Sequence, residues 1–159
     1  MELDPIIKKA LLEIDFFKRY EMLSEKYSKQ RLMDKKSNFI VDKKDVLSMF
    51  ESFGYPARYY GGEKFYKLKY EIIDDITFGI HISLNNNSVE FIWIVINGDK
   101  NLLGDPWGIF SRLVIDPDYI IPMPRFGSYD DLKEIFDYGF TMYNDFKNAL
   151  IRSIKNNGL

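Results

Sequence analysis

Apolar residues recur at three- and four-residue steps in three parts of the chain, and this spacing is typical of helices that bury one face. Asp4 and Pro5 mark the start of the first helix, because aspartate suits an N-cap and proline suits a first helical turn. Asp42 and Gly54 bound the second helix as an N-cap and a left-handed C-terminal residue. The predicted helices cover about 4–30, 43–53 and 129–154, with a polar connection over 33–41.

The third of these helices is the longest. Ser128 and Asp131 form a capping-box-like pair at its start. At 1.5 Å per residue it would be roughly 39 Å long, enough to cross a whole sheet. Gly139 lies in its middle, where glycine costs about 1 kcal/mol relative to alanine, so we expect close packing there.

Between the second and third helices, the period of the apolar residues changes to two, which indicates half-buried strands. The predicted strands cover about 65–72, 76–84 and 88–97. The third is apolar on both sides, since Ile92, Ile94 and Ile96 alternate with other apolar residues. We therefore expect it to be central, or partly covered on its second face.

The need to keep one apolar face predicts the register of these strands. A two-residue turn at Asn86-Asn87 would pair Phe78 with Val95, Ile80 with Trp93 and Ile82 with Phe91. A three-residue turn at Ile73-Asp74-Asp75 would pair Ile72 with Ile76 and Tyr70 with Phe78. Asn97-Gly98 then ends the third strand with a strong turn dipeptide.

The segment 99–127 is less regular. Asp105 and Pro106 repeat the cap-then-proline signal and favour a short helix through about Val114, although the same apolar residues also fit a strand. A fourth strand should lie beside the third, and the candidates are 111–116 and 119–123.

Together these elements predict a two-layer α+β domain. We expect an antiparallel meander sheet of three to four or more strands, with the N-terminal helices and the long C-terminal helix packed on one face. The chain shows no internal repeat and no low-complexity linker, so residues 1–159 are interpreted as a single domain.

The composition excludes several classes of site. The chain has no cysteine and one histidine, which removes disulfides, thiol nucleophiles and multi-histidine zinc sites. No apolar run approaches the roughly 20 residues of a membrane span. The first residues lack the basic start and apolar core of a signal peptide, so a cytoplasmic location is expected. We predict no catalytic set, no metal site, no cofactor and no membrane contact.

His81 is the only imidazole, and we expect it on the less apolar sheet face, across from Lys67 and Ile92. It is either a general base or an ordinary half-exposed strand histidine. Gly61-Gly62 precedes a strand rather than a helix, which favours a hairpin over a phosphate-binding loop.

Close carboxylate pairs and a tyrosine cluster also leave alternatives open. Asp74-Asp75 is most simply a turn and Asp130-Asp131 a first helical turn, whereas Asp116-Pro117-Asp118 is either a loop or a set of oxygen ligands for a divalent cation. Tyr55, Tyr59 and Tyr60, with Arg58, form either a contact patch or a lid on the core.

The formal charge of -2 hides an uneven distribution. Residues 1–69 carry 15 Lys/Arg and 11 Asp/Glu, whereas residues 70–147 carry 5 and 13. Six of the 13 acidic residues of the second part fall in predicted turns and loops, namely Asp74, Asp75, Asp99, Asp105, Asp116 and Asp118. Such residues repel nucleic acid and steer basic protein partners if they cluster, and serve solubility if they do not.

The chain resembles the small immunity proteins that neutralise bacterial polymorphic or contact-dependent toxins. The likeness lies in a single α+β domain, in an acidic, aromatic-containing loop over 104–108, and in its richness in Ile, Lys and Asn. The resemblance implies tight binding to a cognate toxin domain, often a basic nuclease. Trp107 would be an aromatic anchor in such an interface, or else a core residue. The predicted partner-binding residues are Asp74, Asp75, Asp99, Asp105, Trp107, Asp116, Asp118, Tyr59 and Tyr60.

The sequence thus predicts a protein partner and no nucleic acid. Two other functions remain as alternatives. One is an enzyme that acts on a small polar substrate through carboxylates and His81, which a pocket around His81 with a nearby Asp or Glu would favour. The other is a structural adaptor of a phage or mobile element, which a symmetric oligomer would favour. The sequence leaves the oligomeric state open.

Overall fold

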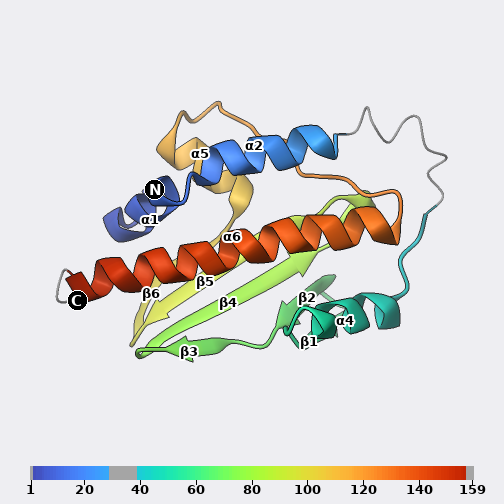
Figure 1. Ribbon diagram of the computed structural model, residues 1–159, viewed down its shortest axis with the longest axis horizontal. Coiled ribbons are helices and arrows are strands. Elements are labelled where there is room, and N and C mark those ends of the chain that lie inside the picture. Colours follow the sequence, from blue (N-terminus) through green and yellow to red (C-terminus); the bar gives the residue numbers. More distant parts are fainter. Residues whose placement is uncertain (1, 29–38, 157–159) are drawn as a thin grey trace.

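The computed structural model describes residues 2–28 and 39–156, which form a sheet with a layer of helices on one of its faces (Figure 1). The helices are α1 (Pro5–Glu13), α2 (Phe16–Lys26), α4 (Lys43–Ser52), α5 (Trp107–Val114) and α6 (Tyr129–Asn156). The strands are β1 (Ala57–Tyr60), β2 (Phe65–Leu68), β3 (Glu71–Ile73), β4 (Ile76–Ser83), β5 (Glu90–Asn97) and β6 (Lys100–Pro106). The predicted α+β class, the antiparallel sheet and the long C-terminal helix are confirmed.

The strands of the sheet follow the order β1-β2-β4-β5-β6, and every pair is antiparallel. β5 lies between β4 and β6, so its predicted central position is confirmed. β2 and β3 pair with opposite halves of β4, at Tyr66↔Ile82 and Ile73↔Ile76 respectively. β1 and β6 are therefore the two ends of this order, and β3, which pairs with β4 alone among the described strands, also has an open outer side. Lys69 and Tyr70 lie in the break between β2 and β3.

The predicted register between β4 and β5 is confirmed. Phe78, Ile80 and Ile82 pair with Val95, Trp93 and Phe91. Asn86 and Asn87 have φ values of 56° and 55°, and the Ser88 N–H donates to the Asn85 carbonyl at 3.1 Å. Asparagine tolerates this left-handed conformation, so the two-residue turn keeps the apolar residues of both strands on one face.

We predicted one strand over 65–72 in which Ile72 pairs with Ile76, and this prediction is wrong. β3 is a separate strand, and Ile73 rather than Ile72 pairs with Ile76. The turn between them has two residues, Asp74 and Asp75, which both adopt positive φ values of 51° and 67°. A shift of one residue moves every side chain to the other face, so Ile72 points outward and is 74% exposed.

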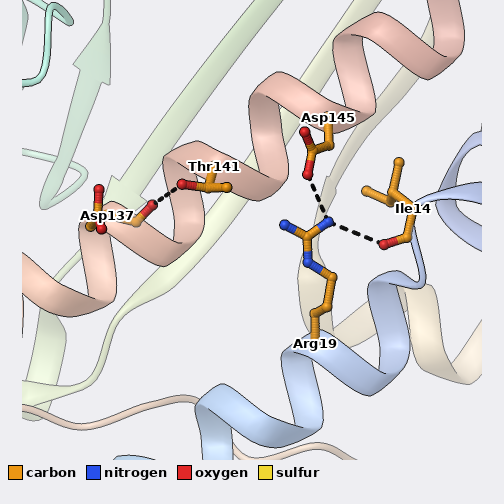
Figure 2. Close-up of polar contacts among 5 residues, drawn as sticks. All are labelled: Ile14, Arg19, Asp137, Thr141 and Asp145. Carbon is orange, nitrogen blue, oxygen red and sulfur yellow. Dashed lines mark hydrogen bonds and ion pairs between the residues drawn. The ribbon is translucent and has the colours of Figure 1, made fainter.

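The predicted single helix over 4–30 is also wrong, because the chain turns between α1 and α2. Asp15 has left-handed angles, φ 56° and ψ 43°, which an aspartate adopts at low cost. Arg19 donates to the carbonyl of Ile14 at 3.1 Å and pairs with Asp145 of α6 at 2.9 Å (Figure 2). Arg19 thus binds the carbonyl left free at the break and ties it to α6. Residues 29–30 of the predicted helix and 33–38 of the predicted connection lie outside the described residues.

The predicted fourth strand at 111–116 or 119–123 is wrong as well. The neighbour of β5 is β6, which returns after a turn at Gly98, whose φ is 65°. The helix alternative for the residues after β6 is confirmed, because α5 runs to Val114 as the cap-then-proline signal indicated. β1 had no counterpart among the predicted strands. Gly61 and Gly62 lie in the hairpin that joins it to β2.

The core lies between α6 and the apolar face of the sheet. The predicted start of α6 is confirmed, since the Asp131 N–H donates to Ser128 Oγ at 3.1 Å. The expected close packing at Gly139 is confirmed too, because a Cβ at this position would overlap with the ring of Phe91. α6 therefore approaches β5 with no side chain between the helix backbone and that ring.

We expect Gly139→Ala to lower the free energy of unfolding by up to about 2 kcal/mol. The added methyl must displace the Phe91 ring, and overpacking of this kind costs about 1–3 kcal/mol, whereas the gain in helix propensity returns about 1 kcal/mol. Gly108→Ala is the matched control, because a Cβ at this helical glycine meets nothing within 4 Å. Urea unfolding measures both, and a Gly139→Ala variant stabilised as much as Gly108→Ala would contradict this packing.

Candidate functional site

Three of the predicted acidic residues come together at one end of the sheet. Asp74 and Asp75 form the β3–β4 turn, and Asp99 lies in the β5–β6 turn. The pairing of Ile76 with Asn97 places these turns side by side. Asp74 pairs with Lys155 of α6 at 3.1 Å, whereas Asp75 and Asp99 form no ion pair with any residue the structure describes. We call these three residues the acidic rim.

The other predicted residues lie elsewhere. Asp105 is on the edge strand β6, opposite Trp93, and Tyr59 and Tyr60 are on β1 at the far edge. Asp116 and Asp118 form a local turn after α5, in which the Asp118 N–H donates to Asp116 Oδ1 at 2.8 Å. Trp107 is 2% exposed, so it is a core residue and not an aromatic anchor on the surface.

The face of the sheet opposite the helices carries a row of isoleucines. Ile92, Ile94 and Ile96 alternate along β5 with the buried Phe91, Trp93 and Val95. Ile72 continues the row, because Ile72 and Ile96 both pair with Thr77. We call Ile72, Ile92, Ile94 and Ile96 the isoleucine stripe. None belongs to the buried core, no described helix covers them, and the acidic rim lies at one end of the stripe.

The other half of this face holds a cluster of four rings, Tyr60, Phe65, Tyr70 and His81. Phe65 stacks on His81 with a centroid distance of 4.6 Å, and Tyr60 stacks on Phe65 at 5.3 Å. The Tyr70 hydroxyl lies 3.0 Å from His81 Nε2, and the Tyr70 ring covers Gly79, where a Cβ would overlap with it. His81 pairs with Lys67 and Ile92 in the sheet, as predicted.

The surroundings of His81 favour the neutral imidazole. Burial lowers the pKa of His81 below 6.5, and the Lys67 ammonium lowers the pKa further, while Glu63 opposes both effects. Within the described ranges, Tyr70 is the hydrogen-bond partner of this ring and no carboxylate contacts it. This geometry holds the ring in place, and Glu63 acts on it through charge without a hydrogen bond to it.

A polar cleft of about 480 Å³ opens between the end of α4, the β2–β3 break and α6. Its floor is Lys147, which is 5% exposed and pairs with Glu71 at 2.7 Å. The ammonium also lies 4.3 Å from the centroid of the Tyr143 ring, so the buried charge is compensated on two sides. The sequence prediction missed this pair, although Lys147 follows Tyr143 and Phe140 on the apolar face of α6.

Tyrosines around this cleft stay protonated well above their ordinary range. Burial, followed by the negative charge of Glu71, raises the pKa of Tyr55 to about 12, although a hydrogen bond to Asn144 opposes the rise. The same two causes raise the pKa of Tyr143 still further. Neither hydroxyl is therefore activated as a base, and the cleft holds a compensated structural charge.

No protein-family model matches the sequence, and no curated protein or solved structure matches it either. Among the described helices, none combines the length and apolar character that a membrane crossing requires. Residues 2–28 and 39–156 also contain no group of three His, Asp or Glu side chains placed to hold a metal ion.

Glu71→Gln should destabilise the fold, because it leaves the Lys147 charge buried with no carboxylate. Removing one partner of a buried pair costs about 3–5 kcal/mol, and the 36% exposure of the Glu71 side chain reduces the expected loss to about 2–3 kcal/mol. Glu13→Gln breaks the exposed pair with Arg152 and should change the free energy of unfolding by less than about 0.5 kcal/mol. Equal effects of the two substitutions in urea unfolding would refute this assignment.

The lowered pKa of His81 predicts a loss of stability in mild acid. Below the ordinary pKa of 6.5 the unfolded chain takes up a proton that the folded chain still resists, so stability is full above this value and falls as the pH drops through the folded pKa. We expect the parent to lose more unfolding free energy than His81→Phe between about pH 7.5 and pH 5.5. Parallel losses in the two proteins would show that His81 does not contribute.

Proposed function

We propose that this chain is a non-enzymatic protein-binding domain, and that the isoleucine stripe with its acidic rim is its binding surface. The observation that carries the proposal is the uncovered face of the sheet. Four isoleucines share one side of neighbouring strands there, and Ile72 is 74% exposed. A contiguous apolar surface rimmed by polar residues is characteristic of protein interfaces, because its burial is favourable only when a partner covers it.

The charge beside the stripe favours a basic partner. Asp75 and Asp99 are exposed and form no ion pair with described residues, so their field reaches the solvent. Carboxylates at the rim of an interface increase the association rate of a positively charged partner and disfavour an acidic one. A second copy of this chain would bring its own carboxylates to the same rim, which argues against a symmetric dimer through this face.

The role that fits this surface is that of an immunity protein. The resemblance to proteins that neutralise bacterial toxins supports a cognate partner that is itself a basic toxin domain. The chain would cover the catalytic or an adjacent surface of the toxin with the stripe, while the rim carboxylates pair with its Lys and Arg side chains. Tight binding would be the entire activity, since neutralisation needs no chemistry from the inhibitor.

The test is co-expression of this chain with the product of each neighbouring gene that is toxic when expressed alone. We expect the parent to restore growth and to co-purify with one such product. Ile72→Lys should weaken the complex at least about tenfold, because it places a charge in the apolar part of the interface. Asp99→Lys should weaken it by a smaller factor, with most of the effect in the association rate and at low salt.

Two matched variants serve as controls. Leu12→Lys alters an exposed apolar residue of α1, 55% exposed, and Asp118→Lys reverses an acidic residue far from the stripe in the chain, in the turn after α5. Both should bind as the parent does. A complex that survives Ile72→Lys but not Asp118→Lys would move the interface to the α5 turn. A stable homodimer that dissociates on Ile72→Lys would show that the stripe serves self-association.

A further inference from the structure

A basic groove lies at the opposite half of the same sheet face. It has a volume of about 510 Å³, and its lining includes Arg58, Tyr60, Lys67, Lys69 and Tyr70. No carboxylate lines it, although the chain as a whole carries a net charge of -2. Arg58, Lys67 and Lys69 form no ion pair with any described residue. These cations are therefore available to a ligand.

The cations are placed together by the sheet. Arg58 pairs with Lys67 across β1 and β2, and directly paired residues point to the same face. Like charges in this position repel each other, so the hairpin bears a cost that an anion between them would relieve. Lys67 also lies 4.6 Å from the centroid of the Tyr70 ring, which holds the ammonium over the groove. Glu63 in the β1–β2 turn is the nearby acidic residue that acts on His81.

The backbone of β1 is open on its outer side. The Lys69 N–H donates to the Pro56 carbonyl at 2.8 Å, so in an antiparallel ladder the groups of Arg58 also point toward β2. The N–H and C=O groups of Ala57 and Tyr59 then point away from the sheet. No hydrogen bond within the described ranges reaches them. An edge with unpaired groups is a template for an additional strand.

We propose that the β1 edge binds an acidic extended segment of a protein as an added strand. The residues of that segment opposite Ala57 and Tyr59 would form the backbone hydrogen bonds. The residue between them would lie opposite Arg58, so a glutamate or aspartate there would contact Arg58 and Lys67. Two positions along, the next side chain on this face would lie opposite Tyr60, which is 40% exposed.

The arrangement of the rings favours a protein segment over single-stranded nucleic acid. Bases stack on aromatic faces that are open to solvent. Tyr60 and Phe65 instead face each other at an interplanar angle of 18°, and Phe65 and His81 at 20°. Both faces of Phe65 and one face of Tyr60 are therefore covered by neighbouring rings, whereas the edge backbone remains free. This site does not depend on the isoleucine stripe, and it can be tested without the cognate partner.

The probe is a fluorescein-labelled hexapeptide of alternating valine and glutamate, titrated with the full chain at low salt and followed by fluorescence anisotropy. We expect binding that weakens at least about tenfold in Arg58→Glu and as the ionic strength rises. The matched variant Lys18→Glu, on α2, should bind as the parent does. A peptide of alternating valine and lysine should show no binding.

Backbone methylation of the peptide tests the added strand without any change to the protein. When glutamate lies opposite Arg58, the valines lie opposite Ala57 and Tyr59, and their N–H groups face β1. N-methylation of the valines removes these donors, so binding should be lost. N-methyl groups on the glutamates point to the outer edge and should be tolerated. Equal binding of the two methylated peptides would refute strand addition. Tighter binding of a labelled oligothymidine, lost in Arg58→Glu, would overturn the proposal in favour of nucleic acid.

The outcomes separate this proposal from the proposed function. If the peptide fails to bind while Ile72→Lys still abolishes the partner complex, the edge proposal is wrong and the binding function stands. If the peptide binds at β1 and no partner binds the stripe, the edge site stands alone.

Discussion

The packing of two buried indoles holds the helical layer on the sheet. Trp93 of β5 and Trp107 of α5 meet edge to face with a centroid distance of 5.3 Å, and Phe16 of α2 contacts both. Phe146 of α6 stacks on Trp93 at 4.7 Å. Neither indole N–H has a hydrogen-bond partner among the described residues, a cost of about 1–3 kcal/mol each. Each side chain also buries roughly 150–250 Å² of apolar area, which more than offsets that cost.

This packing explains why the opposite face of the sheet differs so strongly. Every described helix that contributes to the aromatic core lies on one side of the sheet (Figure 1). The other side carries the isoleucine stripe and the stacked rings, and no described helix covers it. The break between β2 and β3 then divides that face in two. Acidic turns lie at the β3 end and cations at the β1 end, and the near-zero net charge conceals the separation.

The sequence was informative wherever a pattern recurred over many residues. The α+β class, the β4–β5 register and the start of α6 could be predicted from long apolar periods and cap residues. It was misleading where one residue decided the geometry. Asp15 breaks a helix whose apolar face continues past it, and the two left-handed residues Asp74 and Asp75 shift the register of β3 by one position. Neither event changes the apolar pattern.

The surface was harder to predict for a related reason. Acidic residues that are close in sequence or similar in type proved to lie on different edges, because their placement depends on strand order rather than on composition. The sequence left Trp107 open as an interface anchor or a core residue, and the structure places it in the core. The basic groove depends on the pairing between Arg58 and Lys67, which requires β1 to be a strand, and no period in the sequence indicated that strand.

The position of α6 after all the strands has a consequence during synthesis. All the strands leave the ribosome before α6, so the apolar residues that α6 covers remain exposed until α6 has been synthesised. The meander β4–β5–β6 can form early from neighbouring segments, but its apolar face then remains open to other nascent chains. The exposure of this face ends when α6 docks, with Gly139 against the ring of Phe91.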